Sequence, residues 1–105
     1  MVQYVVCSSF FRKATGLMFR FPKGPFVYYF PFSSPRKIAI TMWFVFFPID
    51  VVFVDKKGVI VEKVSLRPFT FYRSSVQAFG FYEVPLGASD HLAVGMKISW
   101  KSFFE

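Results

Sequence analysis

The chain has 105 residues and a formal net charge of +7, and 54% of its residues are apolar and 23% aromatic. This length supports one hydrophobic core, so we expect a single domain over residues 1–105. The apolar content excludes intrinsic disorder. It also exceeds what so small a core usually buries, so we expect some aromatic surface to face a ligand, a partner subunit or a membrane.

Cysteine use and the chain start bear on location. Cys7 is the only cysteine, which excludes an internal disulfide and a thiol pair for zinc or redox chemistry. Too few residues precede it for a secretory signal, so we expect a cytoplasmic location. The absence of asparagine favours a thermophilic source, whereas the low glutamate content argues against one.

The N-terminal part predicts strands and one short helix. Residues 2–6 form a β-rich run, and a helix is expected over residues 10–14, ended by Gly16. Over residues 17–21, Leu17, Phe19 and Phe21 alternate with Met18 and Arg20, a strand period. A further strand is expected over the aromatic residues 26–30.

The most apolar stretch, residues 38–54, carries a single charge and must be weighed as a membrane span. Asp50 would cost roughly 2.5 to 3.5 kcal/mol near the centre of a bilayer. Pro48 would break a helix, and the β-branched and aromatic residues favour strands. The sequence DKKG after this stretch, ending at Gly58, predicts a hairpin with Pro48 in the turn before its first strand. We therefore expect strands and no membrane span.

The C-terminal half continues the strand pattern. Residues 67–75 predict an irregular loop rich in arginine and aromatic rings, and residues 78–84 predict a strand. One or two helical turns are expected over residues 88–94, with Ser89 as cap, and a last strand over residues 96–101. This series predicts an all-β fold, a small single-domain β-barrel or sandwich with one or two short helical inserts.

Several motifs recur in the order of a known family, and together they span about Val2 to Trp100. They are GLMFR at residues 16–20, Gly24 before an aromatic strand, Met42 ahead of Pro48-Ile49-Asp50, and Glu83-Val84-Pro85 with Gly87. This order resembles the uncharacterised family known as domain of unknown function 192, small all-β proteins of archaea and bacteria. The resemblance implies a compact all-β fold, and it implies no activity.

The chain departs from that family at one place. The family usually carries a polar Lys-Asn-Thr directly after the methionine equivalent to Met42. Here Trp43, Phe44 and Val45 occupy those positions. If the polar triplet formed a shared reactive site, this protein has lost it.

The strongest functional signal is arginine beside aromatic rings, in FRF around Arg20 and in RPFTFYR at residues 67–73. Rings flanked by cations bind single-stranded nucleic acid on β-barrels, whereas a phenylalanine core with solvated arginines gives the same pattern without a site. Asp50 is expected to accept turn hydrogen bonds or to pair with Arg20 or Arg36. The candidate ligand-binding residues are Arg20, Arg36, Asp50, Arg67, Phe71, Tyr72 and Arg73.

Three functional hypotheses follow. The first is a non-enzymatic binding module whose basic, aromatic face holds an anionic ligand or a protein partner. The second is a β-barrel that binds single-stranded nucleic acid through the same face. The third, ranked lowest, is an enzyme that uses Asp50 or Glu83 with Arg20.

No catalytic residue, metal site or cofactor is expected. His91 is the only histidine, the few carboxylates lack ligand spacing, and no phosphate-binding loop is present. The surplus of rings predicts a homodimer, held partly by Trp100, Phe103 and Phe104.

Overall fold

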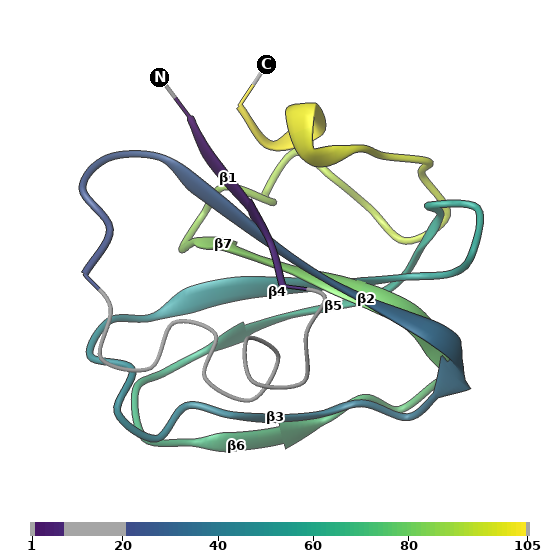
Figure 1. Ribbon diagram of the computed structural model, residues 1–105, viewed down its shortest axis with the longest axis horizontal. Coiled ribbons are helices and arrows are strands. Elements are labelled where there is room, and N and C mark those ends of the chain that lie inside the picture. Colours follow the sequence, from purple (N-terminus) through teal and green to yellow (C-terminus); the bar gives the residue numbers. More distant parts are fainter. Residues whose placement is uncertain (1, 8–20, 105) are drawn as a thin grey trace.

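The computed structural model describes residues 2–7 and 21–104. The helix expected over residues 10–14, and nearly all of the strand expected over residues 17–21, lie outside the described residues. The described residues form seven strands and one short 3-10 helix (Figure 1). They are β1 (Gln3–Val6), β2 (Phe26–Arg36), β3 (Ala39–Thr41), β4 (Ile49–Val54), β5 (Ile60–Leu66), β6 (Phe71–Arg73), β7 (Ala78–Pro85) and η1 (Trp100–Phe103).

The strands form two sheets, and the predicted all-β class is confirmed. The larger sheet has the order β1-β2-β7-β4-β5, and the smaller one pairs β3 with β6. Only β1 and β2 run parallel; the other pairs in both sheets are antiparallel. The sheets are not closed, so the barrel, one of the two expected architectures, is not confirmed.

Both faces of the larger sheet are apolar, and each is covered by a different part of the chain. One face packs against β3, β6 and the residues that flank them, including Ile38, Ile40 and Met42. The other packs against the C-terminal segment through Leu92, Ile98 and Phe103. Figure 1 shows β3 and β6 below the sheet and the C-terminal segment above it.

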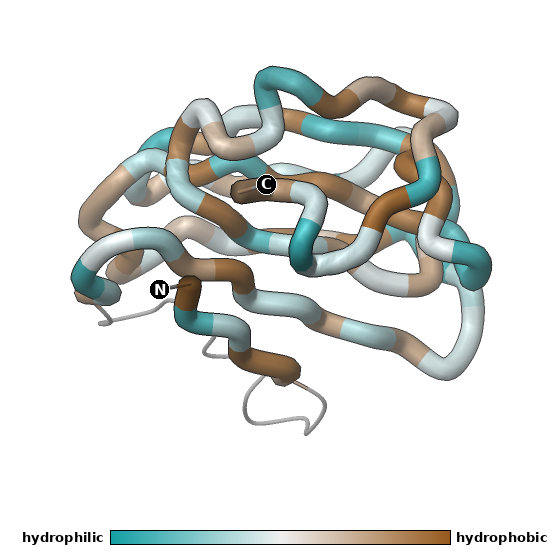
Figure 2. The backbone as a smooth tube through the Cα atoms, turned by 90° about the horizontal axis from the view of Figure 1, so that it is seen from above, coloured by the Kyte–Doolittle hydropathy of each residue, from teal (hydrophilic) through white to brown (hydrophobic). Residues whose placement is uncertain are grey.

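This arrangement explains the long apolar stretch in the sequence. All six residues of β4 are buried, because the strand is central in the sheet and both of its faces are covered. Figure 2 shows hydrophobic residues spread over many segments of the fold, as expected where side chains alternate between two packed faces.

The predicted hairpin is present between β4 and β5. Asp55 Oδ1 accepts hydrogen bonds from the N–H groups of Lys57 and Val59, and Gly58 adopts a left-handed φ of 83°. Pro48 directly precedes β4, where its missing N–H interrupts no ladder hydrogen bond.

Strand β2 is longer than its sequence predicts. It continues through Pro31 to Arg36, and its register with β7 shifts between these two residues. Pro31 lies opposite Gly80, where a Cβ atom would stand 2.8 Å from the carbonyl oxygen of Phe30. Because the register shifts after Pro31, the strand tolerates the missing N–H of proline at this point.

Three expectations for the C-terminal half are wrong. The region 67–75 contains strand β6, and residues 88–94 form successive turns with no helix. Ser89 bonds to Asp50 through its side chain, and the carbonyl oxygens of Ser89 and Leu92 accept hydrogen bonds from Lys63 Nζ, both at 2.7 Å. The last strand is reduced to a single bridge between Val59 and Lys97.

Candidate functional site

Four exposed rings gather where the loop before β4 meets the loop before β6, and we call them the aromatic cluster. Phe69 is central: its ring centroid lies 6.0 Å from that of Trp43, 6.5 Å from Phe44 and 5.4 Å from Phe46, all edge to face. Phe21 stacks on Phe46 at 5.6 Å. Exposed fractions run from 43% for Phe44 to 56% for Trp43, so a contiguous set of large rings faces solvent.

Met42 holds the two loops together. Its side chain is fully buried in the core, and its N–H donates to the carbonyl oxygen of Thr70 at 2.7 Å. Its carbonyl oxygen accepts from the N–H of Phe69 at 2.8 Å and from that of Val45 at 3.2 Å. These bonds prolong the β3–β6 ladder, which places the aromatic cluster on a fixed backbone.

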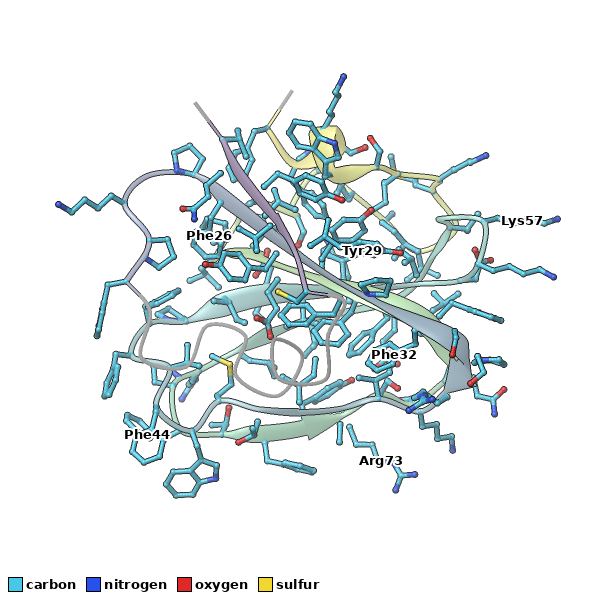
Figure 3. All side chains as sticks on the ribbon, in the orientation of Figure 1. Phe26, Tyr29, Phe32, Phe44, Lys57 and Arg73 are labelled. Carbon is cyan, nitrogen blue, oxygen red and sulfur yellow. The ribbon has the colours of Figure 1, made fainter. Side chains whose placement is uncertain are left out.

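The backbone at the cluster is strained. Phe44 has a φ of 61° and Phe69 a φ of 60°, and no other non-glycine residue of the described chain has a positive φ. The left-handed region costs an ordinary residue roughly 1–2 kcal/mol, and bulky side chains rarely adopt it. Strain of this kind gathers at functional sites. Both strained residues project large rings into solvent, and Figure 3 shows Phe44 at the edge of the molecule.

The outer face of β6 carries a ring and a cation side by side. Phe71 and Arg73 are both exposed and, two residues apart, lie on the same face. Their cross-strand partners Thr41 and Ala39 are small. Figure 3 shows Arg73 pointing away from the fold.

Tyr72 lies between these two residues and faces inward against the core. Its hydroxyl donates a hydrogen bond to Glu62, which raises the pKa of the phenol, and burial adds to this effect. Glu62 also accepts from the N–H of Ser75 at 2.8 Å. The side chain of Tyr72 therefore anchors β6 to β5, and its phenol lies away from the outer face.

The predicted arginines are separated in the structure. Arg67 is exposed in the loop that carries Phe69. Arg36 lies at the opposite end of the small sheet, where its guanidinium stands 5.0 Å from the ring centroid of Phe32 and donates to Ser34. Arg20 lies outside the described residues. Of the predicted arginines that the structure describes, Arg67 is therefore the one that shares a loop with a ring of the cluster, Phe69.

Asp50 belongs to a different part of the molecule. The carboxylate is 2% exposed and faces the C-terminal segment, on the side of the sheet away from β3 and β6. Its Oδ2 accepts from the N–H groups of Gly87 and Ser89, both at 3.2 Å, and from Ser89 Oγ at 2.6 Å, while Oδ1 accepts from Ser65 Oγ at 2.8 Å. The expected turn hydrogen bonds are present. Asp50 fixes the turn after β7 to β4 and does not join the basic, aromatic surface.

Glu83 faces the other side of the same sheet. It is paired in register with Tyr28 on β2 and Val51 on β4, both in the core that β3 and β6 cover. Its Oε1 is buried without a hydrogen-bond partner, and burial raises the pKa of the carboxyl to about 8. Asp50 and Glu83 are therefore not a carboxylate pair for acid–base catalysis.

The C-terminal rings pack largely on their own chain. Phe103 is buried against Tyr82, with ring centroids 5.1 Å apart, and Trp100 stacks on Tyr4 at 4.8 Å. Phe104 remains 39% exposed beside a shallow hollow of about 240 Å³. Of the three rings expected at a subunit contact, two are thus covered within the monomer.

Two other features, a metal-binding group and a membrane-spanning helix, are absent from the described residues. Residues 2–7 and 21–104 contain no group of three His, Cys, Asp or Glu side chains that could hold a metal ion. Within the same ranges, no helix has the length and apolar character needed to cross a bilayer.

Sequence reasoning named Arg67, Phe71 and Arg73 but missed the rest of the site. The sequence pattern places Trp43, Phe44 and Phe46 in a strand, because they continue an apolar run. The replacement of the family's polar triplet by aromatic residues after Met42 was the signal that could have located the cluster.

Comparisons with known proteins give the family. A family model described as "DUF192: Uncharacterized ACR, COG1430" matches residues 1–100. A UPF0127 protein of Pyrococcus horikoshii is 30% identical over 97 residues, covering 90% of this chain and 84% of its own. A UPF0127 protein of Pyrococcus abyssi is likewise 30% identical over 97 residues, covering 90% of this chain and 83% of its own.

A solved structure has the same fold. The crystal structure of a protein of unknown function from Novosphingobium aromaticivorans superposes with a TM-score of 0.83 at 20% identity, covering 92% of this chain and 74% of that one. The family match and this shared fold agree with the order of motifs along the chain. The chain therefore belongs to the DUF192 family of uncharacterised proteins.

Proposed function

We propose that the protein is a non-enzymatic binding module, and that the aromatic cluster with Arg67 and Arg73 is its surface for an anionic partner. The observation that carries this proposal is the cluster itself, three large exposed rings packed around the exposed ring of Phe69 on a strained and hydrogen-bonded backbone. Contiguous exposed apolar surface of this kind marks interaction sites in soluble proteins.

The charge distribution supports an anionic partner. Arg67 lies in the loop of Phe69, and Arg73 lies on the outer face beside Phe71. Asp50 and Glu83 are buried, so neither carboxyl group reaches the surface that carries the arginines. With a net charge of +7, the surface attracts anions over a distance set by the salt concentration.

Anilinonaphthalene sulfonate, an aromatic anion, is a suitable probe. The native protein is expected to bind it with a rise in dye fluorescence, and Phe69→Asn is expected to lower this binding because the central ring is lost. Phe104→Ser removes an exposed ring elsewhere and serves as the matched control. Equal dye binding by the native protein and Phe69→Asn, with both folded by near-ultraviolet circular dichroism, would refute the proposed surface.

Single-stranded nucleic acid is a second candidate, favoured by Phe71 and Arg73. Phe71 is 65% exposed and has the small Thr41 opposite it, which leaves room for a base to stack beside a cation. An oligothymidylate titration at several salt concentrations tests this candidate. Binding that weakens with salt and is lost in Phe71→Ser is the expected result for this mode, whereas binding unaffected by Phe71→Ser excludes it.

The predicted homodimer is a separate proposal. Of the three C-terminal rings, Phe104 is the one that remains exposed, and with the hollow beside it this ring is the surface available for a subunit contact. Sedimentation at micromolar concentration should show twice the chain mass if the dimer forms, and Phe104→Ser should reduce this mass. A cytoplasmic location also stays a prediction, which fractionation of the source cells would test.

A further inference from the structure

We infer that the aromatic cluster docks the protein onto the surface of an anionic lipid bilayer. This inference names the occupant of the surface proposed above and rests on that proposal. The protein would lie on the bilayer, with Trp43, Phe44, Phe46 and Phe69 in the interface and basic side chains at the lipid headgroups.

The geometry of the rings favours lipid over stacked bases. The three contacts of Phe69 are edge to face, with interplanar angles of 75° to 77°. This edge-to-face packing differs from the parallel stacking by which aromatic side chains bind nucleobases. By contrast, apolar rings that project side by side from two loops can insert into lipid, because a fluid apolar medium requires no fixed orientation of the rings.

The chemical type of the rings also fits the bilayer interface. Tryptophan is enriched at the boundary between headgroups and hydrocarbon, where one part of the ring is apolar and the N–H stays wet. Phenylalanine supplies apolar area without a polar group to desolvate. Helices that lie in this interface use Trp and Phe on their apolar face in the same way.

Backbone N–H groups at the cluster are hydrogen-bonded within the protein, which suits a medium with little water. The N–H of Trp43 donates to Thr41 Oγ1 at 3.2 Å, and those of Val45 and Phe69 donate to the carbonyl oxygen of Met42. Unpaired backbone groups are costly to transfer out of water, so these internal bonds lower the penalty of inserting the tip.

The charged side chains near the aromatic cluster are basic, as an anionic lipid surface requires. Arg67 lies two residues from Phe69, and Lys23 lies two residues from Phe21, whose ring stacks on the cluster. Asp55 lies in the β4–β5 turn with Lys57, and Figure 3 places Lys57 and Phe44 at opposite ends of the molecule. Asp90 lies in the segment after β7, which covers the other face of the sheet. The basic tip can therefore approach lipid without these carboxylates facing it.

Co-sedimentation with vesicles tests the inference. The probes are phosphatidylcholine vesicles with and without phosphatidylglycerol, each at low and at physiological salt. The native protein is expected to sediment with the phosphatidylglycerol vesicles, more weakly as salt rises, and to bind phosphatidylcholine alone much less.

Substitutions at the tip should weaken this binding in proportion to what they remove. Loss of one inserted ring in Phe44→Asn or Phe69→Asn should lower partitioning at least about tenfold. Arg67→Gln should lower it about fivefold, and only for the anionic vesicles. Asparagine tolerates the left-handed backbone, so the two ring variants keep the fold. Phe104→Ser is the matched control, since it removes an exposed ring outside the cluster, and it should bind as the native protein does.

The remaining outcomes separate the two proposals. Binding to anionic vesicles that Phe44→Asn and Phe69→Asn do not change would overturn the lipid inference. Absence of vesicle binding, with dye or oligothymidylate binding that depends on Phe69, would overturn the lipid inference and leave the proposed binding surface standing. Absence of binding to all three kinds of probe would overturn both.

Discussion

Asp50 and Glu83 lie on adjacent strands, one residue apart in register, and point to opposite faces of the five-stranded sheet. Asp50 accepts four hydrogen bonds, whereas Oε1 of Glu83 has no partner. The two buried carboxyl groups thus differ in their surroundings: Asp50 is supplied with hydrogen-bond donors, whereas one oxygen of Glu83 has none. This contrast leads to different expectations for stability and for its dependence on pH.

Replacing Asp50 should destabilise the fold. In Asp50→Ala, the N–H groups of Gly87 and Ser89 and the hydroxyls of Ser65 and Ser89 lose their common acceptor. We expect the free energy of unfolding to fall by about 3 kcal/mol, because hydrogen bonds to a charged group are strong and the donors left behind are partly buried. Urea unfolding measures this, with Ser65→Ala as a milder control at about 1 kcal/mol. An unchanged urea midpoint for Asp50→Ala would show that the carboxylate does not hold the turn.

Glu83 should make the protein less stable as pH rises. Its pKa is raised by burial from 4.5 to about 8, so between these values the folded protein keeps a proton that the unfolded chain releases. The contribution of Glu83 to the free energy of unfolding should therefore be highest below pH 4.5 and fall by up to about 1.4 kcal/mol per pH unit until about pH 8. Urea unfolding across this range, compared with Glu83→Gln, checks the prediction. The variant should lose this part of the slope; identical pH profiles for the two proteins would exclude the neutral buried carboxyl.

Phe44→Asn should leave stability nearly unchanged. The left-handed backbone at Phe44, with a φ of 61°, suits asparagine, which offsets the loss of the ring contact with Phe69. We expect a change in the free energy of unfolding within about 1 kcal/mol by denaturant titration. Val45→Asn is the matched control: its side chain is buried, so it should cost several-fold more. A loss above about 2 kcal/mol in Phe44→Asn would mean that the ring serves the fold more than a surface.

Gly80→Ala should be poorly tolerated. An added Cβ would stand 2.8 Å from the carbonyl oxygen of Phe30 and 3.3 Å from Cα of Pro31, and both atoms are backbone. Because a strand backbone cannot move aside as a flexible side chain can, we expect a loss of about 2 kcal/mol or more and a lower thermal midpoint. A midpoint equal to that of the native protein would show that β2 and β7 can separate here without penalty.

The strands of the larger sheet are better predicted from the sequence than the segments that cover its two faces. Strands β4 and β7 are largely buried runs rich in β-branched and aromatic residues, and Gly58 marks the hairpin from β4 to β5. Strand β6 has only three residues, and its partner β3 lies about thirty residues earlier. A pairing this distant leaves no local pattern, so the region is interpreted as a loop from sequence alone.

The same limit applies to the candidate site. Arg67, Phe71 and Arg73 attract notice because cations and rings alternate within a few residues. The cluster needs Phe69 to meet Trp43, Phe44 and Phe46 across two loops, and this contact depends on the hydrogen bonds of Met42. Likewise, Ser89 has the residue type of a helix cap, but its hydroxyl bonds to Asp50, which lies far away in sequence. Tertiary hydrogen bonds override the local preference at both places.

The fluorescence of Trp43 tests the central claim, that the aromatic cluster is the part of the protein that meets an anionic bilayer. The chain has two tryptophans, so Trp100→Phe leaves Trp43 as the reporter in the cluster, and Trp43→Phe leaves Trp100 at the other side of the sheet. With phosphatidylglycerol vesicles, Trp43 emission should shift to shorter wavelength and resist acrylamide quenching, because its exposed ring leaves water, while Trp100 emission should not change. An unchanged Trp43 signal at saturating vesicle concentration, or a shift confined to Trp100, would contradict the account.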